Sequence, residues 1–454
     1  MAERVPGVIT TITDDTGRIV PPTFRRYVTI IGVGDAYKLI QNRRMVRGAG
    51  TNDAIPTVTQ VNTIVSVGDL PGISKYIDGA DYQLSGDEVE WLAGGDEPGA
   101  GDAYYLTFTE TRPASAYQPI LYFNDNLAIA NHGNVLMTTG QINDVTKGVQ
   151  LALENGGKGV IALQLDLRAA VNPNAPTGQE LENAFLACID KLERITDAKL
   201  LMVGMSSGVM QTVTAANILY SHAILASQPE RKQWRTVMMA MPAGTSYLEF
   251  VAAQAAYANS RMVVPAIPTN LSMPGLLGTY DSRYYCAALA GKLLSGGVGD
   301  TYYDEIISGI TFGDSYNYTP DELEYLVQHS VSPAKSLSGV VRNVAAFTTD
   351  GTSALTEDLG VQDIKDYTAY AWNKKLWEVF RNKRSAIGLA GEIKSASENF
   401  LDTFIDKGTI ANHRNVAAYQ DITEPRKYRV TGQILPVFGV GWMDVDFVFF
   451  MSFV

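Results

Sequence analysis

Cysteine and histidine are scarce in this chain of 454 residues, which contains two cysteines and four histidines. Cys188 and Cys286 both stand in apolar patterns of helical spacing, so we expect buried free thiols rather than a disulfide framework. The histidines are His132, His222, His329 and His413. None of them stands in a spacing typical of a metal site. The sequence therefore predicts no metal and no other cofactor, and it is typical of a protein that folds in a reducing cytoplasm.

Positive charge is also in deficit, because 36 lysines and arginines stand against 48 aspartates and glutamates and give a net charge of -12. A nucleic-acid-binding protein normally carries a basic surface, so we expect no nucleic-acid partner. No stretch approaches the roughly 18 apolar residues of a membrane-spanning helix, and the first residues lack the apolar core of a signal peptide. We therefore expect no direct insertion into a membrane and no secretion through a signal peptide.

Catalytic motifs are lacking as well. Two Gly-Thr-Ser segments, 244–246 and 351–353, resemble the nucleophile segment of subtilisin-type proteases, but no histidine stands in a convincing partner motif. Ser246 is better explained as a helix cap, because Glu249 completes a capping box. No phosphate-binding loop or dinucleotide fingerprint occurs. We expect no enzyme, although an α/β enzyme that binds a small ligand at the carboxyl ends of its strands stays open as an alternative.

What the chain does contain is enough apolar material for several cores, since 46% of its residues are hydrophobic and 19% are charged. Its length predicts about three domains. Residues 26–115 contain short β-rich runs separated by Gly, Pro and Asp, which predict a peripheral all-β domain. The expected strands are 27–31, 63–67, 89–92 and 104–109.

Residues 116–337 alternate between helical and strand patterns. Apolar residues at helical spacing predict helices near 142–153, 181–195, 209–226, 246–258 and 284–293. Continuous apolar runs predict buried strands at 160–163, 200–203 and 236–241 and one that begins at 262. Such alternation is typical of a mostly parallel sheet covered by helices, so we expect a central α/β domain here.

Residues 338–427 predict an α+β C-terminal domain. A strand at 341–348 is followed by a long helix at 363–383 and another at 392–406. The two ends of the chain read as extended β arms, an N-terminal arm at 1–25 and a C-terminal arm at 428–454. The whole chain is therefore expected to be an α/β multidomain protein with a β arm at each end.

The arms carry the strongest β signal of the sequence. In the C-terminal arm, alternate residues form one apolar face of the expected strand, and the opposite face is largely apolar too. These alternating residues are Val445, Phe447, Phe449, Met451 and Phe453, and the N-terminal arm contains the similar residues Val8, Ile9 and Ile12. An exposed edge of this composition would aggregate, so something must cover it.

Two arrangements would cover such strands. Each strand could lie within a sheet of its own molecule, or it could join a sheet in a neighbouring molecule. The presence of candidate arms at both ends favours the second arrangement. An open contact of this kind builds helical filaments rather than closed oligomers.

Four segments of the sequence resemble the contractile tail sheath family of phages and related injection machines. They are the Val5-Pro6-Gly7-Val8 opening, the pattern from Asp81-Tyr82 through Trp91 to Thr107, the Val341-Arg342-Asn343-Val344 segment with the helix after it, and the C-terminal strand pair. Their order along the chain is that of the family. Between residues 120 and 335 we recognise no motif of the family.

The resemblance implies a central α/β domain, a peripheral β domain and a C-terminal domain that faces an inner tube. It also implies that the arms complete a sheet in a neighbouring subunit. The expected function is that of a sheath subunit that polymerises helically around the tube and contracts to drive the tube through a target envelope. Its expected partners are further copies of itself, the inner tail tube protein, and baseplate and tail terminator proteins. The expected location is a virion tail that is assembled in the host cytoplasm, and another tail or baseplate structural protein is the alternative.

One basic segment stands out in this acidic chain. Residues 373–384 contain five cations and a single acidic residue. The cations are Lys374, Lys375, Arg381, Lys383 and Arg384. They could form a solvated helix face, or they could grip an acidic tube through charge pairs that salt would screen.

Overall fold

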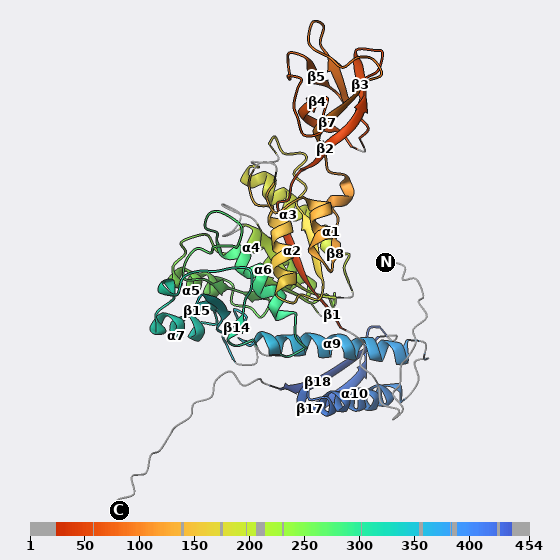
Figure 1. The fold of residues 1–454 in the computed structure, drawn as a ribbon. Helices are drawn as coiled ribbons and strands as arrows, with labels where there is room; N and C mark the ends of the chain where they lie inside the picture. Colours follow the sequence, from red (N-terminus) through yellow and green to blue (C-terminus); the bar gives the residue numbers. More distant parts are fainter. Residues whose placement is uncertain are drawn as a thin grey trace, which may run out of the picture.

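The computed structural model describes residues 24–437 apart from 58, 138–139, 173–175, 197, 206–213, 229–230, 301, 354–356, 382, 384–387 and 425–426 (Figure 1). At its centre is a six-stranded sheet in the order β12-β11-β10-β1-β9-β8. Its strands are β1 (Arg25–Gly32), β8 (Ile120–Tyr122), β9 (Val160–Gln164), β10 (Ala198–Met205), β11 (Arg235–Met238) and β12 (Met262–Val263). All neighbouring pairs are parallel except β8 with β9. A mostly parallel central sheet is therefore confirmed.

The position of β1 corrects the prediction. Tyr27–Ile31 was expected in the peripheral β-rich region, but Tyr27 pairs with Leu200 and Val28 pairs with Val160. Strand β1 thus lies in the middle of the central sheet. Val28, Ile30 and Ile31 are fully buried, and a strand that is apolar on both faces fits a parallel sheet covered by helices. The prediction was wrong because it grouped Tyr27–Ile31 with the β-rich residues that follow it in the sequence.

Helices cover both faces of this sheet. They are α1 (Asp125–His132), α2 (Asp144–Glu154), α3 (Gly178–Leu192), α4 (Thr214–Ala226), α5 (Tyr247–Ala256) and α6 (Ser282–Leu293). Helices α2 and α6 pack on each other and on β1, whereas α3 packs on α4, which contacts β10 and β11. Cys188 in α3 and Cys286 in α6 are buried and free, which confirms the expected buried thiols.

A smaller β domain is inserted between β1 and β8 and projects from the body of the molecule (Figure 1). It contains β2 (Tyr37–Val46), β3 (Asn52–Ala54), β4 (Val61–Gly68), β5 (Tyr82–Ser85), β6 (Glu88–Trp91) and β7 (Ala103–Thr111). They form two three-stranded sheets, β2-β7-β4 and β3-β6-β5, around a core in which Trp91 packs edge-on against Tyr76 and Tyr104. Tyr37 pairs with Thr111, so both connections to the body leave the domain side by side.

A second, four-stranded sheet lies beside the central one. Its order is β13-β15-β16-β14. The strands are β13 (Pro265–Ala266), β14 (Glu305–Ile306), β15 (Ser332–Leu337) and β16 (Val340–Asn343), with helix α7 (Pro320–Gln328) packed on β15. The strand expected over 341–348 is thus shorter and begins one residue earlier. Among the described connections are two short 3-10 helices, Ala114–Tyr117 and Asp314–Tyr316.

The last described elements lie beneath the central sheet. Helix α9 (Leu359–Phe380) runs under it, and below α9 lie α10 (Leu389–Asp406) and the hairpin β17 (Ile410–Gln420) and β18 (Tyr428–Pro436) (Figure 1). Phe400, Leu401 and Phe404 of α10 build a small core there. Residues 428–436 were expected to begin the C-terminal arm, but β18 pairs with β17 of the same chain. The start of the arm at 428 was therefore wrong.

Candidate functional site

Most of the predicted arm residues lie outside the described part of the chain. These are Val8, Ile9, Ile12, Val445, Phe447, Phe449, Met451 and Phe453. Their pairing with another subunit stays a prediction. The structure does describe Phe24 and Val437, where the two terminal segments meet the folded body. We call these two places the N-terminal root and the C-terminal root.

The N-terminal root begins with an aromatic contact. The ring centroid of Phe24 lies 6.0 Å from that of Trp234, 5.7 Å from that of Tyr367 and 5.0 Å from that of Tyr370. Trp234 directly precedes β11, whereas Tyr367 and Tyr370 belong to α9. Phe24 therefore bridges the central sheet and α9 just before the chain enters β1.

Charged residues continue this bridge. Arg26, Lys199 and Arg261 stand at the amino-terminal ends of the parallel strands β1, β10 and β12, and Asp363 and Asp366 face them from α9. Arg26 pairs with Asp363, and the amino group of Lys199 lies 2.9 Å from carboxylate oxygens of both aspartates. Arg261 lies 2.7 Å from Asp366.

Because the cluster is buried, the free energy of unfolding should depend strongly on each of its charged side chains. The side chain of Asp366 is 2% exposed and that of Lys199 is 3% exposed. Burial acts to raise the pKa of Asp366, but Arg261 and Lys199 outweigh it and hold that pKa below its ordinary value. Removing one member would leave a buried charge without its partner, which is far more unfavourable than removing an exposed pair. The cluster therefore holds α9 firmly on the edge of the central sheet.

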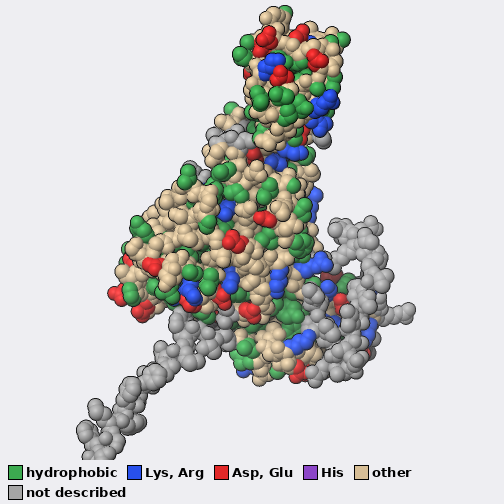
Figure 2. Space-filling view, in the orientation of Figure 1, with side chains coloured by type: hydrophobic (Ala, Val, Ile, Leu, Met, Phe, Trp, Pro, Cys, Tyr) green, Lys and Arg blue, Asp and Glu red, His purple; other side chains and the backbone are tan. Residues whose placement is uncertain are grey.

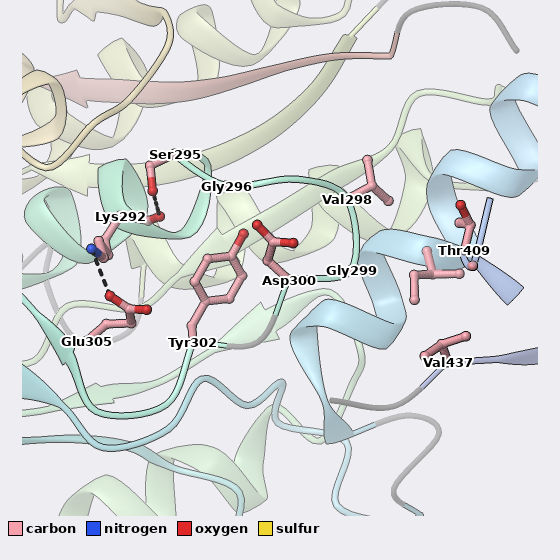
Figure 3. Close-up of a pocket in the computed structure, with 12 residues that line it drawn as sticks. Lys292, Ser295, Gly296, Val298, Gly299, Asp300, Tyr302, Glu305, Thr409 and Val437 are labelled. Carbon is pink, nitrogen blue, oxygen red and sulfur yellow. Dashed lines mark hydrogen bonds and ion pairs between the residues drawn. The ribbon is translucent and has the colours of Figure 1, made fainter. Parts of the chain in front are cut away.

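A cavity of about 440 Å³ adjoins this cluster and the C-terminal root (Figure 3). Asp300 and Tyr302 lie on one side of it, and Thr409 and Val437 lie on the other. Its rim includes Gly296, whose carbonyl oxygen accepts a hydrogen bond from Arg26. The loop 296–300 thus connects the two roots, which lie at the same edge of the molecule.

The hairpin β17–β18 has two outer strand edges. In the described residues, these strands pair only with each other as a two-stranded sheet. Register shifts at Asn412 and Ala417 mark irregularities in their pairing. Outer edges of this kind can accept further strands from another chain.

The cations of the basic segment 373–384, which begins in α9 and continues past its end, differ in exposure and in their partners. Lys375 is 8% exposed, so it does not belong to an exposed basic surface, and its inclusion in the predicted tube contact was wrong. Lys374 donates to the hydroxyl of Tyr370 at 3.2 Å, and Lys383 pairs with Glu392 at 2.8 Å. Arg381 is exposed. Arg384 lies outside the described residues.

An exposed tryptophan, which the sequence analysis missed, stands in the same segment. Trp377 is 57% exposed, and it precedes Arg381 by one helical turn. Exposed Trp and Arg side chains often form the centre of protein interfaces. The signal in the sequence was a large aromatic residue among cations, but helical spacing alone did not show which face it occupies.

Candidate catalytic groups prove to have structural roles. The side chain of Ser246 accepts from the backbone N–H of Glu249, and the Glu249 carboxylate accepts from the backbone N–H of Ser246. This capping box confirms the interpretation of Ser246 as a helix cap. His132 is buried between Tyr122 and Gln164, and burial lowers its pKa to about 4.

The carboxyl edge of the central sheet also contains buried charge. Asp144 at the start of α2 accepts a hydrogen bond from the Tyr284 hydroxyl at 2.7 Å and lies 3.6 Å from Arg283. Burial raises the pKa of Asp144 to about 6, and Arg283 acts against that shift. Asp144 therefore contacts both Tyr284 and Arg283, although Nε and Nη1 of Arg283 have no hydrogen-bond partner among the described residues.

The described residues offer neither a metal site nor a membrane-spanning helix. They contain no group of three or more His, Cys, Asp and Glu side chains placed to hold a metal ion. None of the helices in this part of the chain is both long and apolar enough to span a bilayer.

Comparison with known proteins identifies the fold. A family model described as "Domain of unknown function (DUF4815)" matches residues 35–146, and no curated protein matches the chain. The solved baseplate of the anti-feeding prophage matches with a TM-score of 0.55 and 15% identity, over 75% of this chain and 90% of that chain. The contracted helical sheath of the anti-feeding prophage matches with a TM-score of 0.54 and 11% identity, over 98% and 99%.

A third structure comes from another machine. The contracted PVC sheath complex of an extracellular contractile injection system matches with a TM-score of 0.50 and 13% identity, over 73% of this chain and 86% of that chain. Two of these three structures are sheaths, and one of them is matched over nearly the full length of both chains. This chain therefore has the fold of the contractile sheath proteins.

Proposed function

We propose that the chain is the structural subunit of a contractile sheath, with a location in a virion tail or a related injection machine. Copies polymerise helically around an inner tube and contract to drive that tube through a target envelope. The inner tail tube protein, baseplate proteins and tail terminator proteins are its partners. Assembly takes place in the host cytoplasm, and no catalysis is needed.

The observation that carries this proposal is the two-stranded sheet β17–β18 with its outer edges. A hairpin with unpaired edges is a template for added strands. The chain also carries two terminal segments of strong β character, residues 1–23 and 438–454. Strands from neighbouring copies can therefore complete the sheet, and contacts that do not close on themselves produce a helical polymer.

Contraction then needs a sheath that is metastable when extended. The subunits move as near-rigid bodies, and the strand connections between them act as hinges. New contacts between copies supply the free energy. The buried charge cluster supports rigid-body motion, since it fixes α9 to the central sheet near both roots.

Electron microscopy of the purified chain and of two deletion variants tests the proposal. Full-length protein is expected to form long hollow tubes with helical striation. Variants that lack residues 1–23 or 438–454 are expected to fold, because residues 24–437 supply the described hydrophobic cores, but to form no tubes. Normal tubes from both deletion variants would contradict the proposal.

A baseplate component is the second candidate. One solved baseplate is matched with a TM-score of 0.55. A baseplate protein would form closed rings or discrete complexes rather than long tubes, so the same micrographs separate the two functions.

A further inference from the structure

Strand β2 of the projecting β domain is an edge strand with an unusual degree of exposure. It lies at one side of the sheet β2-β7-β4, and Met45 is its only buried residue. Lys38, Arg43 and Arg44 stand along this edge. Lys38 lies 3.6 Å from Glu110. In the described part of the chain, Arg43 and Arg44 form no ion pair.

The other sheet of the same domain presents acidic side chains. Glu88 and Glu90 point outward from β6, because Val89 between them is fully buried. Glu88 accepts a hydrogen bond from Asn52 at 2.8 Å, and Glu90 accepts one from Gln83 at 2.7 Å. No cation of the described residues pairs with either glutamate. Neutral amide side chains thus hold both carboxylates in place on the outer face of β6.

Strands β2 and β6 differ in the sign of the charged side chains that they carry. Figure 2 shows Lys and Arg side chains on one flank of the projecting domain, and over its upper part Asp and Glu side chains together with a further basic group. The two charged strands belong to separate sheets. One copy therefore carries two surfaces of opposite charge, and in the described residues these surfaces do not pair with each other.

We propose that the projecting domains of neighbouring copies contact each other, with the basic edge of β2 in one copy against the acidic face of β6 in the next. This inference rests on the proposed function, because assembly brings copies side by side. The partner is a second copy because the same domain carries both charges, as a head-to-tail contact requires. The contact also offsets the mutual repulsion of subunits that each carry a net charge of -12.

Another explanation exists for charge on an edge strand. Cations and bulges on edge strands prevent unwanted pairing between sheets, and β2 has a register shift near Asn42, whose φ is 53°. This explanation assigns no role to Glu88 and Glu90. It predicts that loss of the arginines causes disordered aggregation, whereas a subunit contact predicts a specific and reversible loss of assembly.

Charge reversal tests the contact in the full-length chain. The variants are Arg43→Glu with Arg44→Glu, Glu88→Lys with Glu90→Lys, and all four changes together. Each double variant is expected to raise the onset concentration for tube formation by about tenfold. The fourfold variant is expected to restore it, and salt near 1 M is expected to remove the differences, since it screens exposed charges. A control variant with Arg194→Glu and Lys407→Glu makes the same change in net charge outside the β domain and should not match the first double variant.

The outcomes separate this inference from the proposed function. Wild-type chains that form no tubes refute the proposed function. Unchanged onset in the double variants, amorphous aggregation of the arginine variant, or failure of the fourfold variant to recover overturns the contact. A mixture of Arg44→Cys and Glu90→Cys chains tests it without tubes, because Cys188 and Cys286 are buried. A disulfide between the two variants supports the contact, and its absence in concentrated mixtures overturns it.

Discussion

At the scale of single residues, stability should depend strongly on the buried charge cluster formed by Arg26, Lys199, Arg261, Asp363 and Asp366. Its members come from strands β1, β10 and β12 and from helix α9. Arg26 and Asp363 are 337 positions apart in the chain. Hydrophobic periodicity carries no information on such pairs, so the sequence could not predict them. In the sequence, a charged residue at the start of an apolar strand has the same pattern as a strand end that is exposed to solvent.

Asp366→Asn should destabilise the protein by about 3 kcal/mol, because it leaves Lys199 and Arg261 buried with less opposite charge. Denaturant unfolding at neutral pH measures this change. The matched control is Glu398→Gln on α10, which removes an exposed pair with Lys394 at 3.7 Å and should change stability by less than about 0.5 kcal/mol. Equal effects of the two variants would show that the buried cluster has no special role.

Asp144 should give the protein an unusual dependence on pH. Its pKa is raised from 3.8 to about 6 in the folded chain, so between these values the folded state binds a proton that the unfolded state has released. The contribution of this group to stability therefore falls as the pH rises through that window, by up to about 3 kcal/mol. Asp144→Asn lacks this loss, and its stability relative to wild type should improve between pH 4 and pH 7. A constant difference across that range would contradict the assignment.

At the scale of elements, local signals in the sequence were sufficient for most helices. The capping box of Ser246 and Glu249 correctly placed the start of α5, and apolar spacing located α2, α3 and α6. These signals act over one or two turns, so they can be recognised without the rest of the fold.

Strands were harder to assign because their partners are distant. β1 was placed in the wrong sheet, since the sequence does not show that it joins β9 and β10 across the inserted β domain. β17 was missed altogether because its residues are mostly polar and exposed. A strand at the edge of a two-stranded sheet does not need an alternating apolar pattern.

The exposed end of α9 remains a predicted tube contact. Joint reversal of Lys374, Arg381 and Lys383 to glutamate should lower binding to preformed tubes at low salt, with a smaller effect as ionic strength rises. Trp377→Ala should weaken binding at every salt concentration, because an exposed aromatic anchor acts by apolar burial. Co-sedimentation with tubes measures both effects.

Reversal of Lys394, Lys407 and Lys427, which lie elsewhere in the same region and give the same change in net charge, is the control for that experiment. If the control weakens binding as much as the α9 variant, the effect is one of net charge rather than of a contact surface. Lys375 is left unchanged because it is buried, and its replacement would test stability instead.

At the scale of the whole molecule, the two roots lie on the same side of the central sheet, and the projecting β domain lies at the opposite end (Figure 1). Phe24 and Arg26 tie the N-terminal root to α9, and Val437 lines the cavity beside it. The proposed connections between copies would therefore start from one end of the folded body. The sequence predicted the arms from composition, but it could not predict that their roots converge.

A cryo-electron microscopy reconstruction of assembled tubes would test whether neighbouring copies exchange strands. We expect the β17–β18 hairpin of each subunit to gain strands from the terminal segments of neighbouring copies, so that a single sheet contains residues of more than one chain. A reconstruction in which both outer edges of the hairpin stay unpaired, or in which a subunit's own termini cover them, would contradict it.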